Sequence, residues 1–147
     1  MKVTLVERLK AHLDTRMQGA LDAMQSAQSS ANEETKSSAG DKYETGRAMA
    51  QIERDRHAQL YDQIRQERSV LDRIDPLFHF QRVGLGTLVK TTAGYFFVAV
   101  SVGLIDIAGT KVIVVSPQSP LGASLMGKQK GDSFLFQQKK CVIEEVE

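Results

Sequence analysis

The stretch Ser29-Ser-Ala-Asn-Glu-Glu-Thr-Lys-Ser-Ser-Ala-Gly-Asp-Lys-Tyr-Glu44 divides the N-terminal half of the chain. It is small, polar and acidic, and it holds almost nothing that a core could bury. Charged stretches with apolar residues at helical spacing lie on both sides of it. A polar break between two such stretches is where a helical hairpin reverses direction. The sequence therefore predicts two antiparallel helices with the tip of the hairpin inside residues 30–44.

Working outward, the first apolar pattern runs from Val3 to about Gln28. Its members are three or four residues apart, which places them on one side of a helix. The second pattern, after the break, is interrupted by charged residues, so we expect one narrow buried seam between the helices. An arm of roughly 30 helical residues would be about 45 Å long. The predicted seam pairs Leu9, Leu13, Met17, Leu21 and Met24 with Met49, Ile52, Leu60, Ile64 and Leu71.

Composition changes after Asp75-Pro76, where the proline ends the second helix. The following residues are rich in β-branched and aromatic side chains, which favour strands. Ser119 before Pro120 predicts a short helix that stops at Gly127. The predicted fold is α+β, with an antiparallel coiled-coil hairpin over residues 1–75 and a small antiparallel β domain with one short helix over residues 76–147. We expect the strands at 83–89, 95–102, 111–115, 134–136 and 141–146.

The overall composition excludes several classes of protein. Of 147 residues, 41% are hydrophobic and 25% are charged, which is ordinary for a soluble globular protein. A net charge of +1 does not indicate a globally basic nucleic-acid binder. The single cysteine, Cys141, excludes an intrachain disulfide framework and a multi-cysteine metal site. We expect neither a signal peptide nor a membrane span, and hence a cytoplasmic protein.

Asp41 and Glu44 are the candidate functional carboxylates at the break. Three residues apart at the start of a helix, they lie on one side and close together. The same spacing is a capping box, in which Asp41 is the N-cap and Glu44 reaches back, and spacing alone favours the cap. A carboxylate can cap a helix and still face solvent. Glu33 and Glu34 would add negative charge to the same tip.

Four arginines of the second helix fall within a narrow angular range. Such a stripe could meet a phosphate backbone or an acidic protein surface. The favoured alternative is the solvated face of a coiled coil, because acidic residues are interspersed. These arginines are Arg47, Arg54, Arg65 and Arg68.

Two features of the β domain are interpreted as packing. The aromatic run Tyr95-Phe96-Phe97 could line a ligand pocket, but strand aromatics more often belong to the core. Cys141 stands on a predicted strand without a basic residue that would activate it, so we expect a packing role and not a nucleophile.

Two segments carry a family resemblance. Val115-Ser-Pro-Gln-Ser-Pro-Leu-Gly-Ala-Ser-Leu-Met-Gly-Lys-Gln-Lys-Gly-Asp132 contains a Ser-Pro, a small-residue helix and then Gly-Lys-x-x-Gly-Asp before a strand. Gly40-Asp-Lys-Tyr-Glu44 lies at the hairpin tip. Together they resemble the bacterial transcript-cleavage elongation factors GreA and GreB over essentially the whole chain. The residues of the C-terminal motif are Ser116, Pro117, Ser119, Pro120, Gly127, Lys128, Gly131 and Asp132.

The tip motif departs from the family pattern at two places. Typical members read Gly-Asp-Leu-x-Glu-Asn-Ala-Glu-Tyr. Here Lys42 replaces the leucine, and Thr45-Gly46-Arg47 replaces the Asn-Ala-Glu. The match at the tip is therefore partial.

The resemblance implies an FKBP-like fold for the β domain and binding to RNA polymerase through its secondary channel. In family members the tip carboxylates help to hold a magnesium ion in the active site of the polymerase, which stimulates cleavage of the RNA 3′ end in a backtracked complex. Here these carboxylates would be Asp41 and Glu44, and the four arginines would be possible contacts for RNA or polymerase. The protein would be a monomer without a membrane partner or a cofactor of its own. It would not itself be an enzyme, because the polymerase cleaves the RNA.

Two alternative functions stay open. The first is a secondary-channel regulator of the same shape that inhibits the polymerase or regulates it without cleavage. The second is an FKBP-type prolyl isomerase. That activity needs an aromatic-lined pocket and would survive deletion of residues 1–75.

Overall fold

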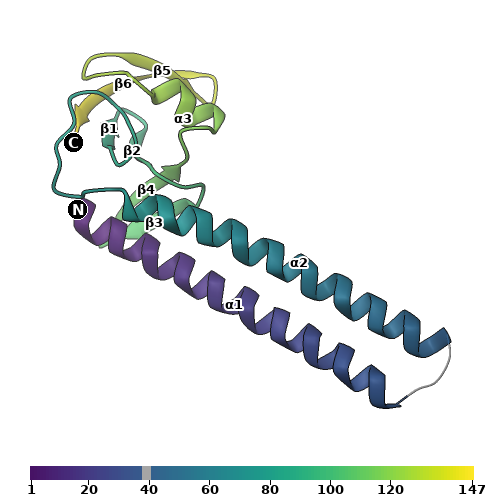
Figure 1. Cartoon of the computed structure of the whole chain (residues 1–147). Helices are drawn as coiled ribbons and strands as arrows, with labels where there is room; N and C mark the ends of the chain where they lie inside the picture. Colours follow the sequence, from purple (N-terminus) through teal and green to yellow (C-terminus); the bar gives the residue numbers. More distant parts are fainter. Residues whose placement is uncertain (38–40) are drawn as a thin grey trace. The chain divides into compact units, whose positions relative to one another are not determined.

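Two long helices precede a β-sheet and a short helix (Figure 1). The computed structural model describes residues 1–37 and 41–147, with the side chains of residues 1–32 and 44–147. This arrangement confirms the predicted α+β class. The elements are α1 (Lys2–Ser37), α2 (Asp41–Asp72), β1 (Leu88–Thr91), β2 (Gly94–Val98), β3 (Gly103–Ile107), β4 (Thr110–Val115), α3 (Pro120–Leu125), β5 (Ser133–Phe136) and β6 (Lys139–Val146).

The chain forms two compact units. One unit contains residues 11–68, which is most of the helical hairpin. The other contains residues 1–10 and 69–147, so both helix ends that flank the hairpin belong to the unit of the sheet. Lys10 Nζ and Asp72 Oδ1 join those two helix ends at 3.6 Å.

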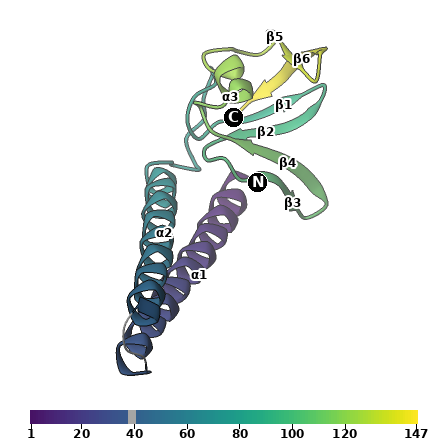
Figure 2. The same ribbon diagram turned by 90° about the vertical axis from the view of Figure 1, so that its right-hand side faces the viewer.

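Within residues 11–68, α1 and α2 run antiparallel and side by side (Figure 2). Arg68 Nε donates to Asp14 Oδ1 at 2.9 Å, and Arg54 Nη1 donates to Gln28 Oε1 at 3.0 Å. Residue 14 of α1 thus faces residue 68 of α2, and residue 28 faces residue 54. These two pairs define the antiparallel register of the hairpin. The hairpin thus follows the prediction, although α1 continues through the first half of the polar stretch to Ser37.

The seam between these helices differs from the predicted one. Met49, Ile52 and Leu60 were expected in the seam but are 63%, 59% and 40% exposed, so this part of the prediction is wrong. The reason is that polar side chains take the seam positions of α2 and bond to α1, which displaces the apolar spacing from the seam. One series of buried or half-buried residues of α2 alternates at steps of four and three, as in a heptad repeat. The residues in this series are Ala50, Arg54, His57, Tyr61, Ile64 and Arg68, while Gly46, Ala58, Glu67, Val70 and Leu71 are also buried or half-buried.

The sheet has the order β3-β4-β2-β1-β6-β5. Neighbouring strands are antiparallel except β2 and β4, which are parallel. Three strand predictions need correction. The strand expected over 95–102 ends at Val98, and residues 99–102 lie outside any strand. β3 was not among the expected strands, and its burial is mixed, with Leu104 and Asp106 exposed. Residues 83–87 precede β1 as a loop, in which Gly86 has a φ of 88°.

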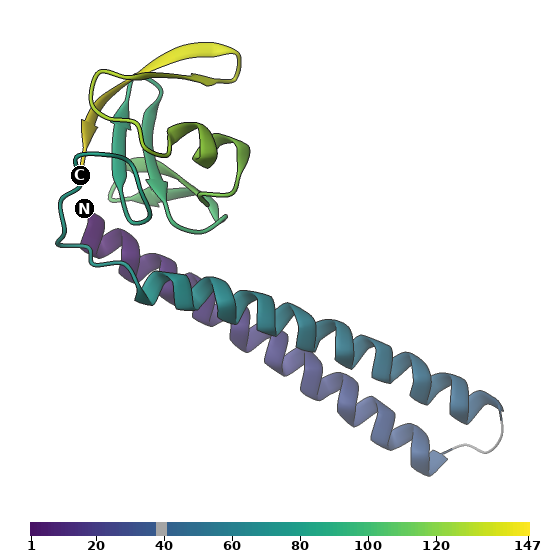
Figure 3. The same ribbon diagram turned by 45° about the horizontal axis from the view of Figure 1, so that its top comes forward.

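Both faces of the central strands β1, β2 and β4 are largely buried, whereas the edge strands β3 and β5 are partly exposed. The short helix α3 lies over one face of the sheet (Figure 3). On this side Val89, Phe96, Val98 and Leu125 form a single buried cluster. On the other face, Phe97 is fully buried, as expected from the alternation of side chains along a strand. Cys141 is also buried. The predicted packing roles of Phe96, Phe97 and Cys141 are therefore confirmed.

Candidate functional site

The candidate carboxylates lie in the first turn of α2. The helix begins at Asp41, and Glu44 follows three residues later, so the two residues share one side of the helix. The unpaired N–H groups and the helix dipole favour negative charge at this end. Glu44 is exposed. The side chain of Asp41, like those of Glu33 and Glu34, lies outside the described residues, and the predicted cap and the predicted metal ligand both fall on it.

The chemistry of this pair suits one kind of metal site. Carboxylate oxygens are preferred ligands of Mg²⁺, which keeps several waters and is often held by only one or two protein carboxylates. By residue type, a magnesium site shared by Asp41, Glu44 and a partner therefore stays a prediction. Among residues 1–32 and 44–147, no three His, Cys, Asp or Glu side chains converge as a metal-binding group.

Two of the four arginines are engaged inside the hairpin. Arg68 is only 23% exposed and pairs with Asp14 of α1. Arg54 reaches Gln28 of α1 and also donates through Nη2 to Asp55 Oδ1 at 2.7 Å. Arg68 therefore joins α2 to α1. Arg54 also joins α2 to α1 and in addition bonds to its neighbour Asp55.

The other two arginines, Arg47 and Arg65, are exposed. Arg65 Nη2 donates to Asp62 Oδ1 at 2.7 Å, and this hydrogen bond, with the charge of Asp62, raises the pKa of Arg65. The structure therefore does not gather the four arginines on one exposed surface. Their role as contacts for RNA or polymerase stays a prediction.

The C-terminal motif has a detailed structural basis at α3. Ser119 caps this helix, because its Oγ accepts from Gly122 N at 3.1 Å and donates to Ser116 O at 2.7 Å. Pro120 is the first helical residue, where its missing N–H leaves no bond unmade. Pro117 is half-buried between the two serines. The cap predicted from the sequence is therefore confirmed.

The second half of the motif shapes the loop after α3. Gly127 and Gly131 have φ angles of 78° and 93°, which residues with a Cβ rarely adopt. Asp132 Oδ2 accepts from Gln129 N at 2.9 Å and closes the loop. Lys128 O accepts from Val83 N at 2.8 Å, which ties the loop to the segment before β1. Gly127, Gly131 and Asp132 therefore determine the conformation of the loop backbone after α3.

Sequence reasoning missed a buried lysine at the start of α1. Lys2 is 5% exposed, donates through Nζ to Phe78 O at 2.6 Å, and lies 5.2 Å from the centre of the Phe80 ring. Burial lowers the pKa of Lys2, although the charges of Glu147 and Asp75 oppose this shift. No local signal marks the residue, because its partners are about eighty positions away in the chain.

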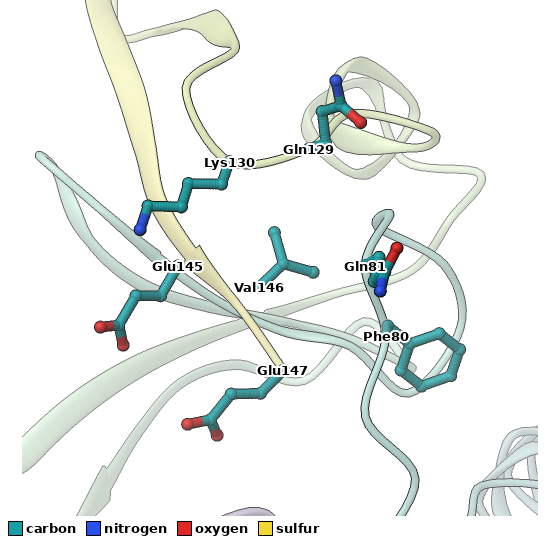
Figure 4. A pocket seen from close by; sticks show the side chains of 7 residues that line it. All are labelled: Phe80, Gln81, Gln129, Lys130, Glu145, Val146 and Glu147. Atoms are coloured by element: carbon teal, nitrogen blue, oxygen red, sulfur yellow. The ribbon is translucent and has the colours of Figure 1, made fainter.

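An open cavity of about 600 Å³ lies beside the end of β6 (Figure 4). Its lining is mostly polar and includes one aromatic side chain, Phe80, which differs from the aromatic-lined pocket expected of a prolyl isomerase. Val146 stands between the acidic residues on one side and Phe80 on the other. The lining residues are Phe80, Gln81, Gln129, Lys130, Glu145, Val146 and Glu147.

No protein-family model matches the chain, and no curated protein matches it significantly. Membership of the GreA/GreB family therefore stays a proposal that rests on the two motifs. In the described part of the chain, no helix carries an apolar run long enough to cross a membrane.

Proposed function

We propose that this protein binds RNA polymerase through its secondary channel and stimulates cleavage of the RNA in backtracked complexes. The observation that carries the proposal is the position of Asp41 and Glu44 in the first turn of a 32-residue helix. At 1.5 Å per residue this helix is about 48 Å long. Such an arm can deliver two carboxylates to a site deep inside a large partner.

The cross-section and surface of the hairpin support insertion into a channel. Two helices side by side, each about 10–12 Å across, form an arm about 20 Å wide. The pairs Asp14–Arg68 and Gln28–Arg54 hold the two helices together along this arm. Most other side chains of α2 are exposed, and this surface is largely hydrophilic, with Met49, Ile52 and Leu60 as its exposed apolar residues.

For residues 76–147 we propose an FKBP-like domain that docks at the rim of the channel. Two observations support this assignment. The short helix α3 lies across one face of a six-stranded sheet, and the motif from Ser116 to Asp132 surrounds this helix. This domain would supply most of the affinity for the polymerase, together with the sides of the hairpin.

At the tip, Asp41 and Glu44 would hold a magnesium ion jointly with the polymerase. When bound, the ion supplies positive charge and makes a water molecule a better nucleophile. Asp41 and Glu44 would supply negative charge and hold the ion in place. The polymerase provides the remaining ligands and the RNA.

A second function is favoured by the residues that follow Glu44. Arg47 stands where typical family members have a glutamate, so the tip carries a positive charge in place of a negative one. The alternative is therefore a secondary-channel regulator that binds the polymerase and does not stimulate cleavage. Wild-type protein that binds a backtracked complex without any gain in RNA cleavage would establish this alternative.

The test is RNA cleavage by a backtracked polymerase complex with this protein added. We expect the wild type to accelerate cleavage and the double change Asp41→Ala, Glu44→Ala to abolish the acceleration. Glu53→Ala is the matched control, because it removes an exposed carboxylate from the same helix. Binding to the polymerase should be nearly equal for all three proteins. If Glu53→Ala also abolished stimulation, the effect would not be specific to the carboxylates in the first turn of α2.

A further inference from the structure

The two edges of the sheet are protected differently. At one edge, β3 carries Asp106, and Arg8 Nη2 covers the carbonyl oxygen of this residue at 3.3 Å. At the other edge, β5 reads Ser133-Phe-Leu-Phe136 and has no charged residue. Edge strands present unpaired N–H and C=O groups, and proteins usually guard them with charges or with a covering element. In the part of the chain that the structure describes, β5 carries no charged side chain and receives no hydrogen bond at its open edge.

The open side of β5 is available for main-chain pairing. Within the described residues, β5 pairs only with β6, and no hydrogen bond reaches its other side. The strand is also held firmly from inside. The rings of Phe134 and Phe136 lie edge-on to Phe96, with centroids 5.8 Å and 5.3 Å away. A strand fixed in this way loses little conformational entropy when another strand is added.

The outward face of the β5–β6 hairpin combines apolar and basic side chains. Leu135 is 69% exposed, and its cross-strand partner is Lys140. Val142, opposite Ser133, is 37% exposed on the same face. An extended segment paired with β5 would therefore meet an apolar contact at Leu135 on this face, whereas Lys139, the neighbour of Lys140, lies toward the other face.

Charge is unequal along this hairpin. Lys139 and Lys140 stand at the turn end, and in residues 1–32 and 44–147 neither forms an ion pair. The turn itself is a tight two-residue connection, with φ angles of 50° at Gln137 and 65° at Gln138. Glu144, on the outward side of β6, lies at the opposite end. The turn end is thus complementary to acidic side chains.

We propose that β5 binds an extended segment of a partner protein, which adds to the sheet as a further strand. Main-chain hydrogen bonds supply affinity in this mode, and alternate side chains supply specificity. The segment has an apolar residue against Leu135 and, on its opposite face, an acidic residue on the side of Lys139. This surface lies outside the hairpin tip, and the inference does not depend on binding to RNA polymerase.

The proposal is tested with blocked hexapeptides and the full-length protein. The probe alternates valine and aspartate, and the first control alternates valine and lysine. Two further controls carry N-methyl groups on all valines or on all aspartates, which removes the amide donors from one edge of the peptide at a time. Amide hydrogen exchange and NMR shifts of residues 133–136 report the site. We expect slowed exchange with the valine–aspartate probe, affinity about tenfold lower with the lysine control, and loss of binding for one N-methylated peptide.

Two matched variants separate this edge from the other one. Leu135→Glu changes an exposed edge residue and should weaken binding of the probe by about tenfold. Leu104→Glu, at 62% exposed on β3, should leave binding unchanged. Equal effects of the two changes, or no slowed exchange at roughly millimolar peptide, would overturn the proposal. Sedimentation of the protein alone gives a further check. A dimer that Leu135→Glu abolishes would show that a second copy occupies this edge, and it would also overturn the proposal.

Discussion

The segment from Ser116 to Asp132 and the first turns of α2 carry the two motifs of this chain, and the structure explains them in different ways. In the segment around α3, the motif residues cap a helix, allow left-handed backbone or close a loop. In the first turns of α2, Glu44 and Arg47 are exposed. The residues of the first motif are thus explained by their roles in the local fold. Exposure of Glu44 and Arg47 gives the second motif no packing role of this kind, and its role in a partner stays a proposal.

The largest effect on the first region is expected from Gly122→Ala. A Cβ at this position would lie 1.8 Å from Ser116 O, which is backbone and cannot move freely. We expect the free energy of unfolding to fall by at least about 3 kcal/mol, measured by urea unfolding. Gly19→Ala is the control, because Gly19 lies inside α1 with nothing within 4 Å of an added Cβ. It should stabilise the protein by about 0.5–1 kcal/mol. Equal stability of the two variants would contradict the account of α3.

The hairpin should respond at the seam and not along its outer surface. Leu13 is fully buried, so Leu13→Ala should cost about 2–4 kcal/mol. Met49→Ala should change stability by less than about 0.5 kcal/mol, because Met49 is mostly exposed. Thermal and urea unfolding of both variants give the comparison. A larger cost at Met49 would restore the seam that the apolar spacing predicted.

The cap of α3 should have a smaller effect. Ser119→Ala removes the acceptor for Gly122 N and the donor to Ser116 O, and it should cost about 1 kcal/mol. Ser119→Thr keeps the hydroxyl and should recover most of that loss. If threonine is as destabilising as alanine, the hydroxyl is not what holds the start of α3.

Local signals in the sequence were sufficient for the elements that depend on local interactions. The apolar spacing around Leu13 predicted α1, and Ser119 with Pro120 predicted α3 and its cap. Hydrophobic aromatic residues such as Phe96 predicted both a strand and a core position. At the candidate site, the spacing of Asp41 and Glu44 predicted that both lie at a helix start, as they do.

The remaining features depend on partners that are distant in the chain. Arg68 takes a seam position because Asp14, 54 residues away, accepts its hydrogen bond. Lys2 is buried because it bonds to Phe78, 76 residues away. The parallel pairing of β2 with β4 likewise follows from the topology of the sheet and not from local composition. Periodicity cannot report such pairings, since it records the residues of one element only.

The central claim is that the carboxylates of the α2 start act inside a partner and not only on the helix. Asp41→Asn separates these roles, because asparagine caps a helix about as well as aspartate does. We expect the free energy of unfolding to change by only about 0.3 kcal/mol. Affinity for the polymerase should be nearly unchanged.

The decisive measurement is the rate of RNA cleavage in a backtracked polymerase complex with wild-type protein or Asp41→Asn. Loss of the negative charge weakens a magnesium ligand while its shape is kept. The account predicts clear stimulation by the wild type and a loss of at least about tenfold with the asparagine variant. Equal stimulation by both proteins would contradict the account and leave Asp41 as a helix cap.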